Sequence, residues 1–358
     1  MQKEPLQFLT KLLETASPSG FEPPIQRVVK KRMQSIADTI EVDVHGNLIA
    51  AVNPDAEIRV MLAGHCDQIG MMVNYIDDSG YLYFGQIGGL DPAVLPGLQV
   101  TILTDQGPLA GVIGSKPVHL IPPEERGKKV ELGKLWIDIG AKDGAEAKGL
   151  VRIGDPVTFK LGVEMLGKHR VSSPGCDDKV GLFICMEALR LFAQAQKSRQ
   201  RSPVGVFAVS TVQEEIGLRG AKTSSYGIDP LVGIAVDVTH ASDNPGADAK
   251  SIGTVKLGGG PIVVRGPNAN TVLQELLITT AKSKRIPFQT LALPAAAGND
   301  ANVMQISRAG MATGIVAVPN RYMHTPIEIC DLRDLDASAK LIAETLLRIT
   351  KRTSFIPA

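Results

Sequence analysis

One stretch near the middle of the chain decides the fold: Val204-Gly205-Val206-Phe207-Ala208-Val209, followed by Ser210-Thr211-Val212-Gln213-Glu214-Glu215-Ile216-Gly217. A short apolar run that ends in polar residues is typical of a buried parallel strand. In an open α/β sheet, ligands bind beyond the carboxyl ends of such strands. Two adjacent carboxylates are costly to desolvate there unless positive charge compensates them. Glu214 and Glu215 therefore indicate either a metal centre or a solvated loop.

Similar apolar runs recur on both sides of this stretch, and helical patterns separate them. We predict further strands over residues 40–44, 48–52, 59–64, 232–237, 289–292 and 314–318. Amphipathic periodicity predicts helices over residues 4–15, 23–36, 180–196, 270–284, 301–308 and 334–351. We expect Gly298-Asn299-Asp300 to cap the helix that follows it. This alternation predicts an α/β fold, with a mixed sheet flanked by helices.

The sequence pattern of residues 68–162 differs from that of the segments on either side. Helical periodicity disappears, and short β-type runs alternate with Gly, Pro and Asp turns, at residues 81–84, 98–103, 109–113 and 135–139. Such spacing predicts a small all-β barrel or sandwich, with a mobile loop over residues 122–129. The chain is therefore expected to have a discontinuous main domain, residues 1–67 and 163–358, and an inserted domain, residues 68–162.

Composition excludes several classes of function. The 358 residues carry a formal net charge of +1, without a Lys/Arg-rich tract, so we expect no nucleic-acid partner. No apolar stretch reaches the length of a membrane span, and the first residues lack a signal-peptide core. The four cysteines show no CxxC spacing, which favours a reduced, cytoplasmic setting: Cys66, Cys176, Cys185 and Cys330.

Ionisable residues stand at predicted strand ends or helix starts in five segments: His65 with Asp67, Asp177 with Asp178, Glu214 with Glu215, Asp237, and His324. Each alone has an ordinary explanation, such as a structural histidine or a helix N-cap. Strand ends of one sheet converge in space, however, even when they are far apart in sequence. Coincidence in all five segments is a poorer explanation than one shared site.

The residue types in these segments suit a pair of metal ions. Three carboxylate ligands, two divalent ions and one hydroxide sum to zero charge, so such a site buries no net charge. Imidazole combined with carboxylate favours zinc or cobalt over calcium or magnesium. Two ions about 3.5–4 Å apart can activate a water molecule and polarise a carbonyl group. A glutamate beside a ligand is placed to act as general base.

The motifs resemble those of a known peptidase family. They are, in order, Gly64-His65-Cys66-Asp67-Gln68-Ile69-Gly70, Pro174-Gly175-Cys176-Asp177-Asp178-Lys179-Val180-Gly181, Val212-Gln213-Glu214-Glu215-Ile216-Gly217-Leu218-Arg219-Gly220-Ala221, Asp237-Val238-Thr239-His240 and Met323-His324-Thr325-Pro326. The set is similar to that of the glutamyl aminopeptidase family, the dinuclear, deblocking aminopeptidases that form tetrahedral shells. The likeness covers nearly the whole chain.

The resemblance implies a role for each residue that matches a motif. Two divalent ions per subunit, Zn²⁺ or Co²⁺, would be held by five ligands: Asp177 bridging both ions, His65 and Asp237 on one, and Glu215 and His324 on the other. Glu214 would be the general base and later the general acid, and Asp67 would orient His65. The substrates would be peptides, hydrolysed at the N-terminal residue. The inserted barrel would join subunits into dimers that assemble into a dodecamer.

Three positions depart from the family pattern. Gln68 stands where the family usually has Glu, Lys179 where Arg is common, and Asn299 where Thr is usual. These departures remove no proposed ligand, but they affect residues that surround the ligands and the substrate. The sequence assigns no substrate-binding residue.

Other functions remain to be separated from this one. The same dinuclear centre could serve a deacylase or a dipeptidase, and a chain without metal could be an inactive, shell-forming scaffold. A glycosidase pair formed by Glu214 and Glu215 is disfavoured. Such pairs span a sugar with carboxyl groups about 5–5.5 or 6.5–9.5 Å apart, a spacing that neighbours on one strand end serve poorly. Aromatic residues, which stack on sugars, are only 4% of the chain.

Overall fold

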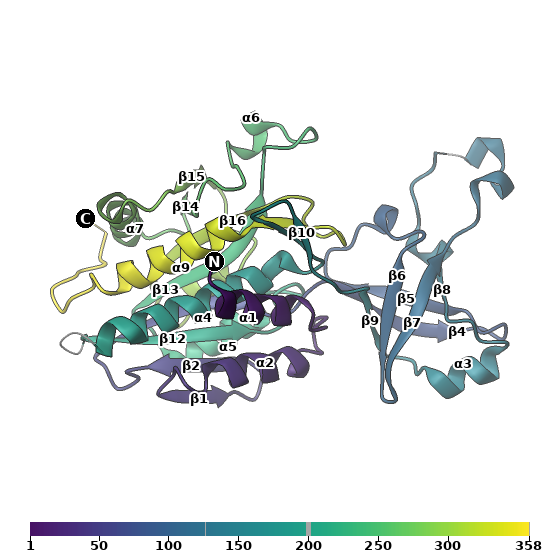
Figure 1. Cartoon of the computed structure of the whole chain (residues 1–358), viewed down its shortest axis with the longest axis horizontal. Helices are drawn as coiled ribbons and strands as arrows, with labels where there is room; N and C mark the ends of the chain where they lie inside the picture. The colour runs from purple at the N-terminus through teal and green to yellow at the C-terminus, as the bar shows by residue number, and fades with distance from the viewer. Residues whose placement is uncertain (126, 198–201, 358) are drawn as a thin grey trace.

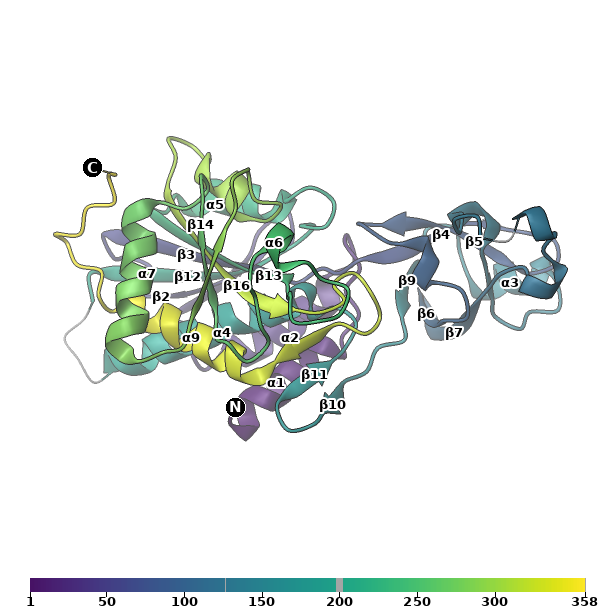
Figure 2. The ribbon, with the colours of Figure 1, turned by 90° about the horizontal axis from the view of Figure 1, so that it is seen from above.

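The computed structural model describes residues 1–125, 127–197 and 202–357. Figures 1 and 2 show a main body built on one large sheet covered by helices, with a smaller β domain extending from one end of it. This arrangement confirms the predicted α/β class with an inserted all-β barrel.

The described residues form an eight-stranded mixed sheet in the order β1-β2-β12-β3-β13-β16-β14-β15. Its central strands run parallel to one another. The bounds are β1 Thr39–Val42, β2 Leu48–Val52, β3 Ile58–His65, β12 Val204–Thr211, β13 Val232–His240, β14 Ile262–Arg265, β15 Gln289–Ala292 and β16 Ala312–Asn320. The stretch with which the sequence analysis began is β12, and it lies beside β3.

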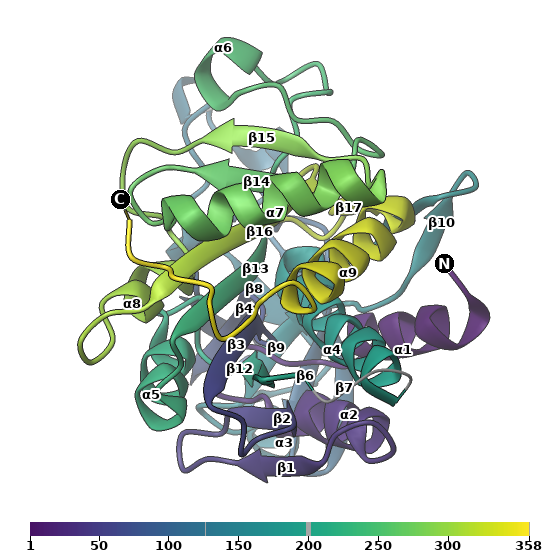
Figure 3. The same cartoon turned by 90° about the vertical axis from the view of Figure 1, so that its left-hand side faces the viewer.

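Helices cover both faces of this sheet (Figure 3). One face packs against α1 Lys3–Leu13, α2 Pro23–Met33, α4 Cys176–Lys197, α7 Thr271–Lys284 and α9 Leu332–Leu346. The other packs against α5 Arg219–Ile228 and α8 Ala301–Gln305. In β3, for example, Val60 and Leu62 belong to the first core while Met61 and Ala63 belong to the second. Burial on both faces explains why the central strands are apolar without interruption.

The second domain is a closed barrel, not a sandwich, in the order β4-β5-β8-β7-β6-β9. Its strands are β4 Gly70–Ile76, β5 Leu82–Ile87, β6 Gln99–Thr104, β7 Gly107–Gly114, β8 Trp136–Asp138 and β9 Pro156–Phe159. Four of them match predicted runs, whereas β4 and β9 close the barrel and were not predicted. The barrel has its own apolar core, which includes Ile102, Ile137 and Val157.

The sequence patterns did not predict some of the helices and short elements. Helix α3 Gly144–Leu150 lies in the barrel domain, so the expectation of no helix there was wrong. Short elements complete the chain: η1 Pro92–Val94, η2 Val118–Leu120, η3 Pro123–Glu125, η4 Leu132–Lys134, α6 Ala249–Ile252, and a small sheet of β10 Glu164–Leu166, β11 Arg170–Ser172 and β17 Ile329–Asp331. The predicted mobile loop includes η3, while Arg126 lies outside the described residues. No helix in the described ranges is long and apolar enough to span a membrane.

Candidate metal centre

The ends of the central strands bring the predicted site residues together. His65 ends β3 and lies opposite Thr211, the last residue of β12, so the Glu214 and Glu215 turn follows directly beside it. Asp237 lies on the neighbouring β13. Together with residues from α4 and from the loop after β16, they line one cavity of about 490 Å³: His65, Asp177, Glu214, Glu215, Asp237 and His324.

Asp177 lies at the centre of this cluster. One of its carboxylate oxygens, Oδ1, is 3.1 Å from Nε2 of His65, and the other, Oδ2, is 3.3 Å from Nε2 of His324. The His324 Nε2 atom also lies 3.6 Å from Oε2 of Glu215. Each oxygen of one carboxylate thus faces a different imidazole, which is the arrangement that a ligand shared by two cations requires.

Two groups of side chains could each hold a metal ion, with ligand atoms within 4.8 Å of one another. One group is His65, Asp177 and Glu215, and the other is His65, Asp178 and Asp237. Sequence reasoning treated Asp178 mainly as a helix cap. Its buried carboxylate does accept a hydrogen bond from N–H of Gly181, at 3.1 Å, but it also accepts one from N–H of His65, at 3.3 Å.

The surroundings of His65 fix which ring nitrogen can bind a metal. Nδ1 lies 3.0 Å from the main-chain oxygen of Asp67, which can only accept, so Nδ1 carries the proton and Nε2 faces Asp177. The carboxylate of Asp67 is farther away, 3.5 Å from Nδ1. It accepts hydrogen bonds from Ser19 Oγ at 2.6 Å and from N–H of Glu214 and Glu215 at 3.0 and 3.2 Å. Asp67 therefore contacts both halves of the cluster.

The acidic groups of the cluster are too crowded to ionise fully by themselves. Burial, together with neighbouring carboxylates, raises the pKa of Glu214 to about 10 and that of Glu215 to about 8. Burial also raises the pKa of Asp237 well above its ordinary value. Burial alone would raise the pKa of Asp177 too, but the two histidines outweigh it and hold that pKa low.

One further observation indicates a missing positive charge. Oε1 of Glu215 is buried and has no hydrogen-bond partner among the described residues. A buried carboxylate oxygen without a donor is costly unless a cation neutralises it. The donor set of imidazole and carboxylate groups therefore fits divalent metal ions of the zinc and cobalt type.

Sequence reasoning missed Glu328, which is buried behind the cluster. Its Oε2 accepts the N–H of Asp177 at 2.8 Å, and its Oε1 accepts the N–H of His324 at 2.9 Å. One carboxylate thus holds the backbones of two candidate ligands. Asp300 was assigned only to a helix cap, but its Oδ2 instead accepts from Thr211 Oγ1 at 2.7 Å. The contacts of Glu328 with Asp177 and of Asp300 with Thr211 join segments that are far apart in the chain, so they have no local sequence signal.

The barrel domain also contacts the cluster, through two glycines that follow β5. A Cβ atom added to Gly89 would lie 3.1 Å from Nδ1 of His324, and one added to Gly88 would lie 3.3 Å from Oε2 of Glu215. Gly89 also lines the cavity. A larger residue at Gly89 would force the His324 ring to move, so the absence of a side chain permits this close approach.

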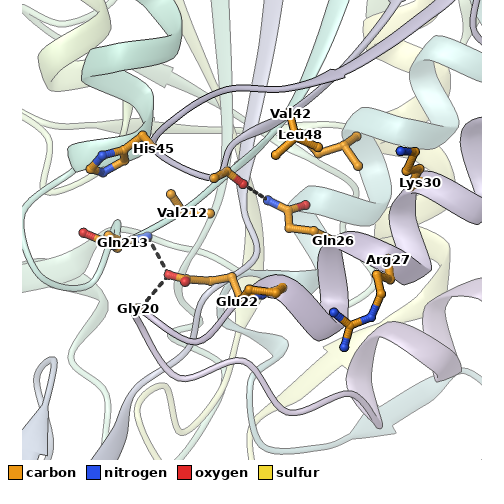
Figure 4. Close-up of a pocket in the computed structure, with 12 residues that line it drawn as sticks. Gly20, Glu22, Gln26, Arg27, Lys30, Val42, His45, Leu48, Val212 and Gln213 are labelled. Atoms are coloured by element: carbon orange, nitrogen blue, oxygen red, sulfur yellow. Dashed lines mark hydrogen bonds between the residues drawn. The ribbon is translucent and has the colours of Figure 1, made fainter.

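A second cavity, of about 360 Å³, lies on the other side of the same turn (Figure 4). Val212 and Gln213 line it, whereas Glu214 and Glu215 line the first. Oε1 of Glu22 accepts the N–H of Gln213 at 3.2 Å, which holds Gln213 at a φ of 56°. Glu22 is the only carboxylate among the described residues that line the second cavity, and no candidate group of metal ligands is found among them.

A helix-covered sheet with an inserted barrel, and with histidines and carboxylates gathered at its strand ends, is typical of metal-dependent α/β hydrolases. The profile of a family described as M42 glutamyl aminopeptidase matches residues 46–341. The chain belongs to this family, as its sequence motifs predict.

Known proteins are similar to this chain over almost its whole length. The lysyl aminopeptidase of Pyrococcus furiosus is 38% identical, over 98% of this chain and 99% of the relative. The structure of a TET aminopeptidase from a marine-sediment Thaumarchaeota archaeon is 33% identical, covers 97% of both chains and has a TM-score of 0.92. The Pyrococcus horikoshii TET1 peptidase, described as assembling into a tetrahedron or a large octahedral shell, is 31% identical with a TM-score of 0.85 and covers 96% of this chain and 100% of that one.

Proposed function

We propose that the chain is a dinuclear metallo-aminopeptidase that removes the N-terminal residue of peptides. The observation that carries this proposal is the placement of Asp177, whose two carboxylate oxygens each face one of two imidazoles, 3.1 and 3.3 Å away. Membership of an aminopeptidase family supports the reaction. The cavity at the cluster, of about 490 Å³, is large enough for the side chain of one residue.

The proposed ligands are those that the resemblance implies. Asp177 would bridge two ions, His65 and Asp237 would complete one set, and Glu215 and His324 the other. The 3.6 Å separation of His324 Nε2 and Glu215 Oε2 supports their assignment to one ion. His65 belongs to both possible ligand groups, with Asp237 in one and with Glu215 in the other. When bound, two zinc or cobalt ions would neutralise the acids, activate a water molecule and polarise the scissile carbonyl group.

Glu214 would transfer the proton. Its buried side chain lines the cavity, and its Oε2 lies 3.8 Å from Nε2 of His65. Oε2 would accept a proton from the attacking water and deliver it to the nitrogen of the leaving amine, so that the C–N bond breaks as the new acid forms. Asp67 would position this base, because its carboxylate accepts the N–H of both Glu214 and Glu215, and would help to orient His65.

The two domains would have different roles, one in catalysis and the other in assembly. Residues 1–67 and 163–358 would form the catalytic domain, and residues 68–162 would form the inserted barrel that joins subunits. The barrel extends away from the main body, where a second copy can reach it (Figure 1). The shells described for the TET relatives support dimers that build a dodecamer. Four buried cysteines, all free in the described part of the chain, support a cytoplasmic setting.

A substrate comparison tests the function. The purified protein, loaded with Zn²⁺ or Co²⁺, should hydrolyse peptides with a free amino terminus, leave N-acetylated copies of the same peptides intact, and lose activity in a chelator. Hydrolysis of the acetylated peptides would instead indicate a deacylase, and activity restricted to two-residue substrates a dipeptidase. A protein that binds neither metal near neutral pH and cleaves nothing would be an inactive scaffold.

A further inference from the structure

The cavity beside the cluster has a wall that none of the roles above uses. Apart from the proposed ligands and Glu214, four of its lining residues are apolar: Leu218, Val238, Leu293 and Met323. Ala297 and Gly298 add small surfaces, and Thr239, His240 and Asn299 add polar ones. Under the proposed function, this wall would face the side chain of a substrate's first residue.

The charges in this wall decide which side chains it can accept. Neither Lys nor Arg is among the described residues that line it, so a glutamyl or aspartyl side chain would find no cation. Every carboxylate that lines it belongs to the cluster: Asp177, Glu214, Glu215 and Asp237. A lysyl ammonium group would thus have to compete with metal ions for its partner. An unpaired charge is expensive to remove from water, whereas an apolar side chain gains from burial here.

Hydrogen bonds hold both ends of the segment between β15 and α8 that contributes to this wall. The N–H of Leu293 donates to the main-chain oxygen of Arg265 at 2.8 Å, and the N–H of Ala297 donates to Oδ1 of Asn268 at 2.5 Å. The buried Asn268 is itself held, because its Nδ2 donates to Oε1 of Gln305 at 2.7 Å. The segment is fixed at both ends, so the size and polarity of the wall are built before substrate arrives.

We propose that this wall selects peptides whose first residue has an uncharged, medium-sized apolar side chain, such as leucine or methionine, with Leu293 and Ala297 as specificity-determining residues. The proposal rests on the proposed aminopeptidase function. It separates this chain from the lysyl and glutamyl preferences named for its relative and its family. Leu293 sets the polarity of the wall, and Ala297, a buried member of the apolar cluster against which Leu293 packs, keeps that part of the wall small.

Matched peptides that differ only in the first residue test the proposal. For the metal-loaded protein, kcat/KM for a Leu-first peptide should exceed that for the Lys-first and Glu-first copies by about tenfold or more. In Leu293→Glu, the ratio of Lys-first to Leu-first kcat/KM should rise about tenfold, because the wall then offers a carboxylate. The control is Leu166→Glu, at a 42% exposed position on β10, which should leave the ratio unchanged.

A second variant covers the case in which Leu293→Glu does not fold. Ala297→Leu narrows the wall, so it should lower kcat/KM for Leu-first peptides relative to Ala-first peptides by about tenfold, without loss of bound metal. A wild-type protein that prefers Lys-first or Glu-first peptides would overturn the proposal, as would unchanged ratios in both variants or an equal shift in Leu166→Glu. If the protein binds metal but cleaves none of these peptides, the proposed function itself fails.

Discussion

The large sheet and the inserted barrel approach the same cavity with opposite kinds of residue. The sheet presents ionisable side chains at its strand ends, including His65 and Asp237. The barrel presents Gly88 and Gly89, whose lack of a side chain leaves room for Glu215 and His324. One region therefore carries charge, and the other shapes the space around that charge with its backbone.

This difference explains why the two regions can have separate cores. Strand ends are rigid because both faces of the sheet are buried, so they hold like-charged groups closer together than a loop could. The barrel packs around its own apolar cluster and needs only a close approach at one turn. The effect of a substitution should thus be largest where charge is removed from the sheet and smaller where the barrel is altered.

The largest effect should follow from Glu214→Gln. The amide cannot take a proton from water, so kcat should fall by about 10²- to 10⁴-fold while the content of bound metal stays at the wild-type level. Steady-state kinetics and elemental analysis measure the two quantities. Glu275→Gln, at an exposed position on α7, is the matched control and should behave as wild type. Retention of substantial activity by Glu214→Gln would contradict its role in proton transfer.

The variant Glu215→Gln should distinguish the role of Glu215 from that of Glu214. An amide is a poor ligand for zinc, and this side chain lies 3.6 Å from His324 Nε2, so we expect metal affinity to fall by at least about 100-fold. Activity should return in part when metal is added in excess, which it should not do for Glu214→Gln. Isothermal titration calorimetry with the metal ion measures the affinity of each variant. Equal metal affinity in both variants would remove the distinction between the two roles.

Glu328→Gln should have an intermediate effect. The wild-type carboxylate accepts the N–H of Asp177 and that of His324, but an amide offers one acceptor and turns its NH₂ group toward the other donor. We expect metal affinity to fall about 10- to 100-fold, the range for groups that hold ligands in place. Circular dichroism should show a folded protein. If affinity is unchanged, the backbones of the ligands are held by other contacts.

Sequence patterns located the parts of the site that belong to regular elements. His65 and Glu214 could be predicted because each follows an apolar strand, and strands of one sheet end together. Glu328 could not, because its contact with Asp177 forms only on folding, and its contact with the nearby His324 belongs to no recognised motif. Gly89 could not either, since a glycine after a strand is ordinary, and its contact with His324 depends on where the barrel packs. The barrel itself was predicted from its turns, but not its closing strands.

The variant Gly89→Ala tests how the barrel's close approach affects metal binding. The added Cβ would lie 3.1 Å from Nδ1 and 3.2 Å from Cε1 of His324, so the ring must shift by a few tenths of an ångström. We expect a several-fold loss of metal affinity, smaller than that of Glu328→Gln, because the ring can adjust. Gly85→Ala, in strand β5 just before Gly89, is the control, since the atom nearest to its added Cβ would be 3.8 Å away. An equal loss in both variants would point to damage to the barrel as a whole.

The contact that joins the two regions should affect stability rather than metal binding. Lys179 is fully buried, and its Nζ donates to Oε1 of Gln68 and to the main-chain oxygen of Thr15. Burial lowers the pKa of Lys179 from 10.5 to about 7. Between pH 7 and 10 the unfolded chain therefore binds a proton that the folded chain does not, so this residue makes the free energy of unfolding rise with pH.

Lys179→Met should remove that dependence. We would measure the free energy of unfolding of the wild type and of the variant by denaturant titration at pH 7, 8 and 9. The wild-type value should increase relative to that of the variant by up to about 1.4 kcal/mol per pH unit. Lys30→Met, at an exposed position on α2, should follow the wild-type profile. A difference between wild type and Lys179→Met that stays constant with pH would mean that Lys179 keeps its charge in the fold. Gln68 would then suffice as its partner, and the junction, like the sheet, would hold a buried charge.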